Sequence, residues 1–275
     1  MPEPIFLAGK LPALDALLLD LLGSLTPDEW AAPTVAKQWR VKDVAAHLLD
    51  GNLRVLSSLR DGYAGDPPAN VASYEDLVAY LNRLNADWVT AMKRVSPELL
   101  LLLLRTTGPL YSAYYAGLDP FGEAPWPVAW AGEETSRNWM HIAREYTEKW
   151  LHQQQIRDAV GKPGLLTKEW FGPFLDVFLR ALPHAYRDVA APEGTVVQLH
   201  ISTEIGGDSF LQKEASGWAF VPGSAAPSAV IRIDPASAWK LFSKSLRPID
   251  LRDKIIVEGD EFLAAPALGM VAVMA

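Results

Sequence analysis

One stretch of the sequence, from Ser136 to Lys162, carries side chains that could bind a metal ion. A helix advances about 100° per residue, so residues separated by four, seven and eleven positions share one side of it. In this stretch those positions hold only imidazoles and carboxylates, namely His141, Glu145, Glu148 and His152. The opposite side holds Trp139, Ala143, Tyr146 and Trp150. This pattern predicts a helix whose aromatic face packs into a core.

Glu148 and His152 lie one helical turn apart, which lets a carboxylate oxygen and an imidazole nitrogen converge on one cation. A third ligand must come from another helix. His47, in the segment WRVKDVAAHLLDG, is the candidate because it lies beside an apolar helix edge. Two other interpretations stay open. A His/Glu stripe is also typical of a solvated helix face, and a lone histidine at an apolar edge is also typical of a hydrogen-bonded core residue.

Two features of the stripe argue against the solvated face. Neither lysine nor arginine occurs within it, although exposed faces usually mix both signs of charge. Glu145 and Glu148 are three residues apart and would repel each other by about 0.2–0.5 kcal/mol if no positive group lay between them. These features favour a metal site, but the spacing alone does not decide the question.

The first two thirds of the chain show helical periodicity. Ser73 is a predicted N-cap, Pro97 fits a first helical turn, and Gly108 is predicted to end that helix. The predicted helices cover residues 11–25, 41–63, 74–95, 97–108, 136–162 and 167–188. Long helices with short connections predict an up-and-down bundle.

Strand patterns begin near residue 190, where GTVVQLHIST, GWAFVPG and SAVIRID are short and rich in β-branched or aromatic residues. A helix capped by Asp234 follows, then a strand and a last helix in DKIIVEGDEFLAAPALGMVAVMA. We therefore predict an α+β protein with two domains. A four-helix up-and-down bundle occupies residues 1–190, and a small α/β domain occupies residues 191–275, with AAPEG as the linker.

The composition limits the classes of function. The net charge of −8 argues against nucleic acid or an anionic membrane as a partner. The longest apolar run, Leu99 to Leu104, is far shorter than the ~20 residues of a membrane span. The absence of cysteine excludes disulfides and thiolate nucleophiles from the chain itself. Since the N-terminal segment also lacks a signal-peptide pattern, we expect a cytoplasmic protein that acts on a small molecule as a monomer or homodimer.

Three segments together resemble a known family. WRVKDVAAHLLDGN is similar to the first ligand helix of the DinB-like superfamily, and EKWLHQQQIRDAVGKPG is similar to the Glu-x3-His helix of its mycothiol-dependent maleylpyruvate isomerase branch. IIVEGDEFLAAPALGMVAVMA resembles the C-terminal, sterol-carrier-like domain of that branch. The resemblance implies a DinB-like bundle that holds a divalent metal, usually zinc, with nickel as an alternative, through His47, Glu148 and His152.

The resemblance also implies a chemistry. A low-molecular-weight thiol such as mycothiol binds the metal as thiolate, adds to a cis double bond, and is eliminated after rotation to the trans isomer. His141 and Glu145 would then be neighbours of the site. The family has a Thr-Gly-Arg segment as a substrate clamp, and the matching stretch here, FSKSLRP, has Ser245 at the arginine position. Arg247 is our candidate for the clamp; Lys244 and Arg252 are alternatives, and all three also fit ordinary surface charge.

Three hypotheses follow. The leading one is a metal-dependent isomerase or S-transferase that uses an external thiol, with His141, Glu145 and Arg247 as the candidate catalytic residues. The second is a metal-dependent hydrolase in which Glu145 is the general base. The third is a non-enzymatic protein that binds a small apolar ligand. Gln155 stands where many relatives have aspartate, a departure that leaves the three ligands intact.

Overall fold

The computed structural model describes residues 3–63, 65, 67, 73–223 and 226–270. The described residues form two compact units. One contains the chain up to Glu123 together with Arg137–Gly164, and the other contains Ala124–Ser136 together with the chain from Leu165 onward. Each unit has its own secondary structure and its own core, and each is described separately below.

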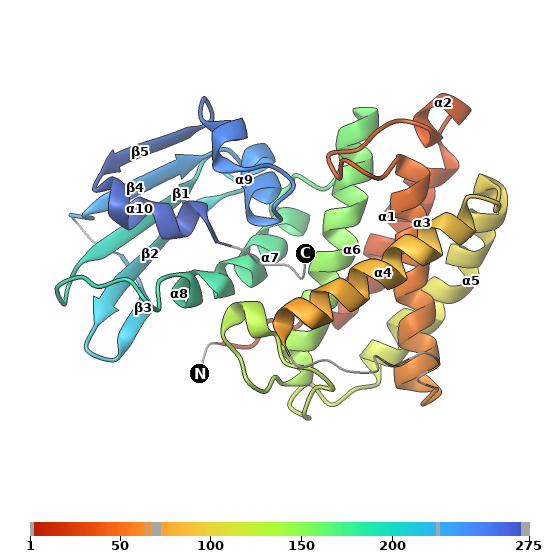
Figure 1. The fold of residues 1–275 in the computed structure, drawn as a ribbon, viewed down its shortest axis with the longest axis horizontal. Helices are drawn as coiled ribbons and strands as arrows, with labels where there is room; N and C mark the ends of the chain where they lie inside the picture. The colour runs from red at the N-terminus through yellow and green to blue at the C-terminus, as the bar shows by residue number, and fades with distance from the viewer. Residues whose placement is uncertain (1–2, 64, 66, 68–72, 224–225, 271–275) are drawn as a thin grey trace. The chain divides into compact units, whose positions relative to one another are not determined.

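The first unit is a bundle of helices (Figure 1). Its long helices are α1 (Leu11–Gly23), α3 (Val41–Arg54), α4 (Tyr74–Met92), α5 (Pro97–Ala116) and α6 (Asn138–Val160), with the short helix α2 (Pro27–Trp30) between α1 and α3. Helix α3 packs against α4, α5 and α6, and α1 packs against α5 and α6. Helix α3 therefore contacts three of the other long helices of the bundle.

The centre of the bundle is built from apolar side chains that recur every three or four residues. On α3 these are Val41, Val44, Ala45, Leu48 and Leu49, all of which are buried. They pack with leucines of α1 and α5 and with a buried isoleucine of α6. Burying such a side chain stabilises the fold by about 1.5–3 kcal/mol. This packing fixes α3 against α6, so residues at the edge of the two helices face each other.

Helix α4 begins as predicted. The Ser73 hydroxyl accepts a hydrogen bond from the backbone N–H of Asp76, whose carboxylate accepts one from the Ser73 N–H. This reciprocal cap satisfies two backbone donors that the first turn leaves unpaired.

The predicted end of α5 at Gly108 is wrong, because the helix continues to Ala116. Gly108 is buried against α1, where an added Cβ would lie 3.0 Å from a carboxylate oxygen of Asp15. The glycine therefore permits close helix packing. Pro109 removes one backbone donor, but the next two turns bury Tyr111 and Tyr115, and this packing maintains the helix.

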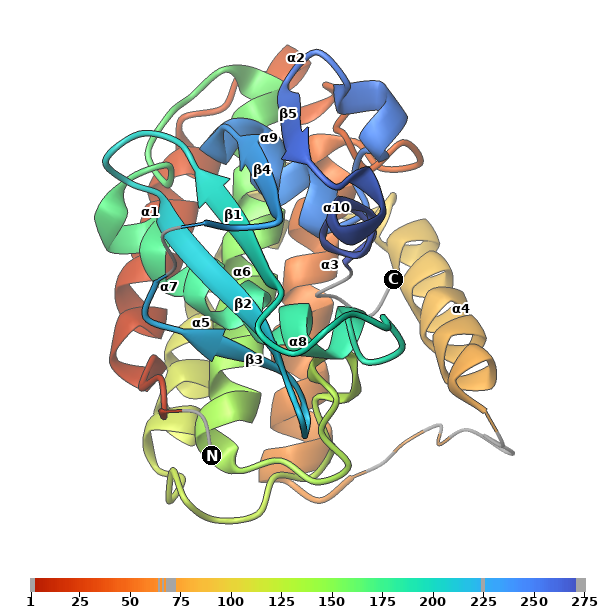
Figure 2. The ribbon, with the colours of Figure 1, turned by 90° about the vertical axis from the view of Figure 1, so that its left-hand side faces the viewer.

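The second unit contains a five-stranded sheet in the order β3-β2-β1-β4-β5 (Figure 2). Its strands are β1 (Val196–Ile201), β2 (Gly207–Glu214), β3 (Gly217–Val221), β4 (Ala229–Ile233) and β5 (Ile255–Gly259). Strands β1 and β4 are parallel, and the other neighbouring pairs are antiparallel. Strand β2 was not predicted. Of its residues only Leu211 is fully buried, so its sequence lacks a clear alternation of apolar and polar positions.

Helices accompany this sheet. They are α7 (Lys168–Phe178), α8 (Leu182–Ala185), α9 (Pro235–Phe242) and α10 (Glu261–Leu268). The cap of α9 is as predicted, since the Asp234 side chain accepts from the N–H of Ser237. The single helix predicted for residues 167–188 is instead divided into α7 and α8 by a 3₁₀ turn. Pro183 explains the break, because its ring lacks an N–H and clashes with the preceding helical turn.

The sequence pattern predicts a domain boundary near residue 190, whereas residues 165–190 group with the strands in the structure. Where the chain divides into independently folding parts stays a prediction. No helix within the described ranges is both long enough and apolar enough to cross a membrane.

Candidate metal centre

Helices α3 and α6 bring three potential ligands together. His47 lies on α3, and Glu148 and His152 lie on α6. Each offers one ligand atom, and these atoms all lie within 4.8 Å of one another. Nε2 of His152 is 3.3 Å from a carboxylate oxygen of Glu148, and the two imidazole ring centroids are 4.6 Å apart. The structure thus brings together the three residues that the sequence nominated; their role as ligands stays a prediction.

The neighbours of His47 hold its backbone and ring in place. Val44 and Leu48 are buried on the same helix, and the indole N–H of Trp88 on α4 donates to the carbonyl of Ala46 at 2.8 Å. The Trp39 ring lies 4.9 Å from the His47 ring, measured between centroids. His47 is therefore positioned by packing on both sides, with little freedom to choose another rotamer.

The protonation of His47 suits a metal ligand. Its Nδ1 is buried and has no hydrogen-bond partner among the described residues. Burial, followed by unfavourable electrostatic interactions with His152 and Arg54, holds the pKa of His47 well below its ordinary value. The imidazole is therefore neutral, and neutral imidazole is the form that donates a lone pair to a cation. An unpaired buried nitrogen is costly, and coordination would relieve that cost.

His152 is oriented by Gln155. Nδ1 of the imidazole lies 2.9 Å from the side-chain carbonyl oxygen of Gln155, which can only accept a hydrogen bond. Nδ1 therefore donates to Gln155, and Nε2 faces the Glu148 carboxylate. Metal-binding histidines usually have such a partner behind the ring. The side chains of His152 and Glu148 are 12% and 36% exposed, so the Glu148 edge of the site reaches the surface.

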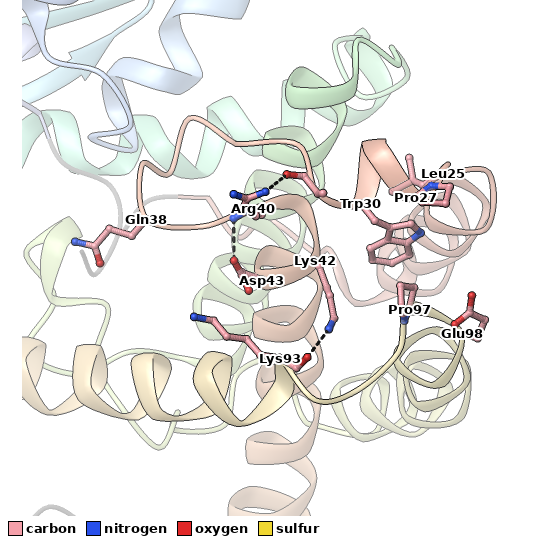
Figure 3. Close-up of a pocket in the computed structure, with 11 residues that line it drawn as sticks. Leu25, Pro27, Trp30, Gln38, Arg40, Lys42, Asp43, Lys93, Pro97 and Glu98 are labelled. Atoms are coloured by element: carbon pink, nitrogen blue, oxygen red, sulfur yellow. Dashed lines mark hydrogen bonds between the residues drawn. The ribbon is translucent and has the colours of Figure 1, made fainter.

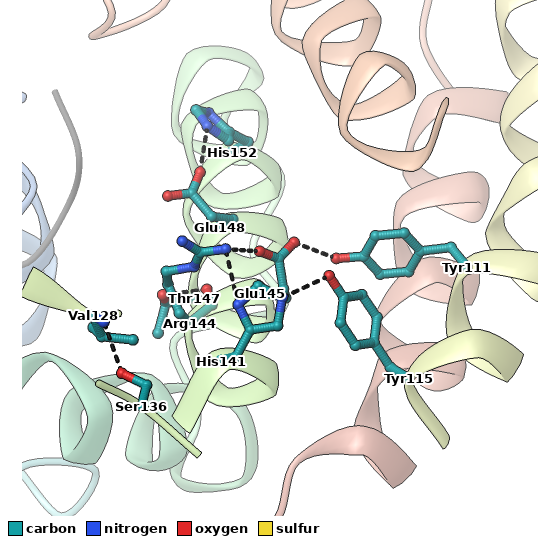
Figure 4. Close-up of polar contacts among 10 residues, drawn as sticks. All are labelled: Tyr111, Tyr115, Val128, Ser136, His141, Arg144, Glu145, Thr147, Glu148 and His152. Carbon is teal, nitrogen blue, oxygen red and sulfur yellow. Dashed lines mark hydrogen bonds and ion pairs between the residues drawn. The ribbon is translucent and has the colours of Figure 1, made fainter. Parts of the chain in front are cut away.

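The other two members of the predicted stripe lie in a buried polar network (Figure 4). The Glu145 carboxylate accepts a hydrogen bond from the Tyr111 hydroxyl at 2.7 Å and from Arg144 Nη2 at 2.6 Å. His141 is fully buried; its Nε2 lies 3.3 Å from the Tyr115 hydroxyl, and its Nδ1 lies 3.2 Å from the same Arg144 nitrogen. Both tyrosines come from α5, so this network joins α5 to α6.

The charges of this network are fixed by their surroundings. Burial, opposed by Glu145 and helped by Arg144, lowers the pKa of His141 to about 4, so this imidazole is neutral at pH 7. Burial alone would raise the pKa of Glu145, but Arg144 foremost, then His141 and Tyr111, lower it overall. Glu145 is therefore a stable carboxylate whose oxygens are already engaged, which makes it a weak general base.

A second buried polar cluster lies one turn further along α6. Lys149 Nζ donates to a carboxylate oxygen of Asp15 at 2.8 Å and to the side-chain oxygen of Asn52 at 2.9 Å. Asn52 in turn donates to the hydroxyl of Thr107. This cluster ties α1, α3 and α5 to α6, and so it supports the helices that carry the ligands.

The sequence reasoning missed Arg144, Lys149 and Tyr111. The positive charges that are absent from the stripe stand at its edges, next to Glu145 and Glu148. Charged residues directly beside a stripe of opposite charge were the available signal. The tyrosine had no comparable signal, because its partner depends on how α5 packs against α6.

The predicted clamp residues lie in the second unit. Arg247 is 72% exposed and pairs with Asp250, with Nε 3.1 Å from a carboxylate oxygen. Lys244 and Arg252 are exposed as well. Arg247 as a catalytic residue stays a prediction.

A separate groove of about 750 Å³ opens on the helical unit near Trp30 (Figure 3). None of the three potential ligands lines it. Two of its cations are already engaged: Arg40 Nη1 donates to the carbonyl of Ala31 at 2.9 Å, and Lys42 Nζ donates to the carbonyl of Lys93 at 3.1 Å. The groove therefore adds no residues to the chemistry of the candidate centre.

Comparison with known proteins places the chain in a family. Residues 11–157, more than half of the sequence, match the family described as mycothiol maleylpyruvate isomerase N-terminal domain. The chain belongs to this family. The family resemblance inferred from the sequence is thereby confirmed for this N-terminal range, which includes all three potential ligands of the candidate centre.

Solved structures agree with the predicted α+β fold. Two crystal structures of the mycothiol-dependent maleylpyruvate isomerase, one of them of a mutant, match with a TM-score of 0.50 and 14% sequence identity. Each match covers 91% of this chain and 92% of the other, and at this identity it shows the fold alone. Sterol carrier protein 2 like 2 from Aedes aegypti, at 18% identity over 35% of this chain and 95% of its own, has a TM-score of only 0.27 and supports no argument. No curated protein matches the sequence.

Proposed function

We propose that this protein is a divalent-metal-dependent enzyme that uses a low-molecular-weight thiol to isomerise, or to transfer sulfur to, a small electrophile. The convergence of His47, Glu148 and His152 within 4.8 Å is the observation that carries the proposal. Membership of the maleylpyruvate isomerase family supports the thiol-dependent class of chemistry. The chain contains no cysteine, so the thiol must be an external molecule such as mycothiol.

The donor set fits a catalytic metal. Two imidazoles and one carboxylate are ligands that zinc accepts, and three protein ligands leave a position for a small molecule. Zinc is therefore the first cation to test, and nickel is the second. A divalent cation held there would supply positive charge that favours the thiolate form of a bound thiol over the neutral thiol.

The chain's own residues prepare this site. Burial keeps His47 neutral, and Gln155 lies against Nδ1 of His152, which leaves Nε2 of that ring as the atom that would bind a cation. The Trp39 ring lies 4.9 Å from His47 and 6.2 Å from His152, measured between centroids, and so packs beside both rings. Side chains positioned in this way need little rearrangement when they bind a ligand.

The proposed isomerisation balances without an oxidant or reductant. The thiolate sulfur forms a bond to one carbon of a cis double bond, and the displaced π electrons move toward a conjugated carbonyl group. Rotation about the resulting single bond is followed by return of those electrons, which reforms the double bond in the trans geometry and breaks the C–S bond. In S-transfer the C–S bond remains, and another group leaves with its electron pair.

Hydrolysis is less well supported. It needs a general base beside the metal, and Glu145 is the candidate from the sequence. Both of its carboxylate oxygens are engaged, by Arg144 and Tyr111, and its pKa is lowered. No comparable observation favours the hypothesis of a non-enzymatic protein that binds an apolar ligand.

The test starts with metal content. Wild type and Glu148→Ala are purified without chelator or nickel resin and analysed for metals, with Glu134→Ala as a control that removes the same charge from an exposed loop. We expect near-stoichiometric zinc in the wild type and the control, and none in Glu148→Ala. Loaded protein is then assayed for cis–trans conversion of unsaturated dicarboxylates with and without thiol. Wild-type protein that will not take up zinc would refute the proposal, as would zinc-loaded protein whose turnover needs no thiol.

A further inference from the structure

Arg144 is a nearly buried cation beside the candidate metal centre. It lies one helical turn before Glu148 on α6, and its side chain is 13% exposed. Figure 4 shows its guanidinium between the carboxylates of Glu145 and Glu148. The family's three ligands and the proposed reaction leave this residue without a role.

The hydrogen bonds of Arg144 are incomplete. Its Nη2 is shared between the carboxylate of Glu145, at 2.6 Å, and Nδ1 of His141, at 3.2 Å. Its Nε is buried, and within the described ranges it has no partner. Nη1 likewise donates no hydrogen bond to any residue that the structure describes. A guanidinium has five N–H donors, so the donors on Nε and Nη1 of Arg144 have no partner among the described residues.

The surroundings keep Arg144 charged. Burial would lower its pKa, but Glu145 and, more weakly, Glu148 raise it above the ordinary value. Of the Arg144 donors, Glu145 accepts only Nη2, and its second oxygen accepts from Tyr111. His141 offers only a neutral ring nitrogen. A buried cation with unused donors is a binding group for an anion with planar oxygens, which is a carboxylate.

We propose that Arg144 binds a carboxylate of the small molecule that reacts beside His47, Glu148 and His152. This inference rests on the proposed function and assigns a residue of this chain to hold an acid group close to the reacting atoms. Glu145 and His141 are then positioning residues that orient the guanidinium through Nη2. The carboxylate can belong either to the electrophile or to the thiol, and the experiment separates these two sources.

The alternative is that Arg144 only neutralises Glu145. A double variant distinguishes the two roles. Arg144→Gln with Glu145→Gln removes one charge of each sign and leaves Tyr111 a hydrogen-bond partner, so the net charge is unchanged. It also avoids the unpaired carboxylate that Arg144→Gln alone would leave. Arg105→Gln is the control for a lost positive charge, because Arg105 is exposed on α5.

Binding is measured by calorimetry with two probes, maleate and N-acetylcysteine, on metal-free and on zinc-loaded protein. Melting temperatures of all variants show that they are folded, and Arg144→Lys, which keeps the charge but loses the Nε–H, is tested if the double variant is not. We expect at least tenfold weaker binding of maleate to the double variant and less than a twofold change for Arg105→Gln. If only N-acetylcysteine binds more weakly to the double variant, the carboxylate belongs to the thiol, and Arg144 is still supported as its binding group.

Unchanged binding of both probes to the folded double variant would overturn the inference, and so would a wild type that binds neither probe. The metal-free titration separates this outcome from failure of the proposed function. Maleate bound through Arg144 in protein that takes up no zinc supports the anion site and rejects the metal enzyme. Zinc uptake and thiol-dependent turnover, together with maleate binding that does not depend on Arg144, support the metal enzyme and reject the anion site.

Discussion

Replacing Gln155 tests whether the contact behind His152 matters for metal binding. In Gln155→Leu the ring loses the acceptor that now lies 2.9 Å from Nδ1. The proton can then move to either nitrogen, and the ring can rotate away from Glu148. A hydrogen bond of this kind contributes about 1 kcal/mol, and loss of such a partner typically costs about tenfold to hundredfold in metal affinity. That range corresponds to about 1.4–2.7 kcal/mol of binding free energy.

The measurement is zinc affinity by competition with a chromophoric chelator at pH 7. Gln154→Leu is the matched control, because Gln154 is equally buried on the same helix and, among the described residues, its side chain has no hydrogen bond to His47, Glu148 or His152. Gln155→Glu provides the opposite perturbation. Its carboxylate makes a stronger hydrogen bond to the ring, so zinc should bind more tightly, while the metal-free protein should melt at a lower temperature.

The reasoning fails if Gln155→Leu binds zinc within twofold of the wild type. It also fails if Gln154→Leu loses as much affinity as Gln155→Leu, because the effect would then reflect general loosening of α6. A loss of zinc affinity in Gln155→Leu that is absent from Gln154→Leu supports the contact with His152.

Three further predictions concern the stability of the two units and are tested by urea unfolding. His141 binds a proton below about pH 6.5 in the unfolded chain but only near pH 4 in the native protein, so acid lowers the free energy of unfolding. Between pH 7 and pH 4 the wild type should therefore lose about 3 kcal/mol more of this free energy than His141→Gln, and equal losses would contradict the burial of a neutral ring. Lys149→Met should cost about 3–5 kcal/mol because it leaves Asp15 buried without its partner, and adding Asp15→Asn should restore much of that stability; no recovery would show that the ion pair is not the cause. Gly259→Ala should cost about 2 kcal/mol or more, because φ is 84° and the new Cβ would lie 2.3 Å from a carbonyl oxygen, whereas Gly194→Ala, with φ of 85° and nothing within 4 Å, should cost less.

The candidate ligands could be found from the sequence because their geometry is mostly local. Glu148 and His152 share a helix face by periodicity alone, and His47 stands at the edge of an apolar stripe that must be buried. The sequence could not show that α3 lies against α6. The family resemblance supplied that pairing, and the structure contains it.

Other features depend on packing that no short segment encodes. Gly108 and Pro109 are helix breakers by local propensity, yet α5 continues because Tyr111 and Tyr115 are buried in its next turns. The engagement of Glu145 by Tyr111 has the same origin. The sequence does not distinguish a free carboxylate from one that accepts a hydrogen bond from a tyrosine. The hydrolase hypothesis could therefore be weighed only once the position of α5 beside Glu145 was known.

The placement of the ligands on two helices has a kinetic consequence. His47 and Glu148 are about a hundred residues apart in the chain, and the three-ligand site is complete only after α3 and α6 have docked. Closing so long a loop is entropically costly and precedes any gain from the metal. Zinc should therefore leave the refolding rate nearly unchanged and slow the unfolding rate, unlike the metal in a zinc finger, where binding and folding are one event.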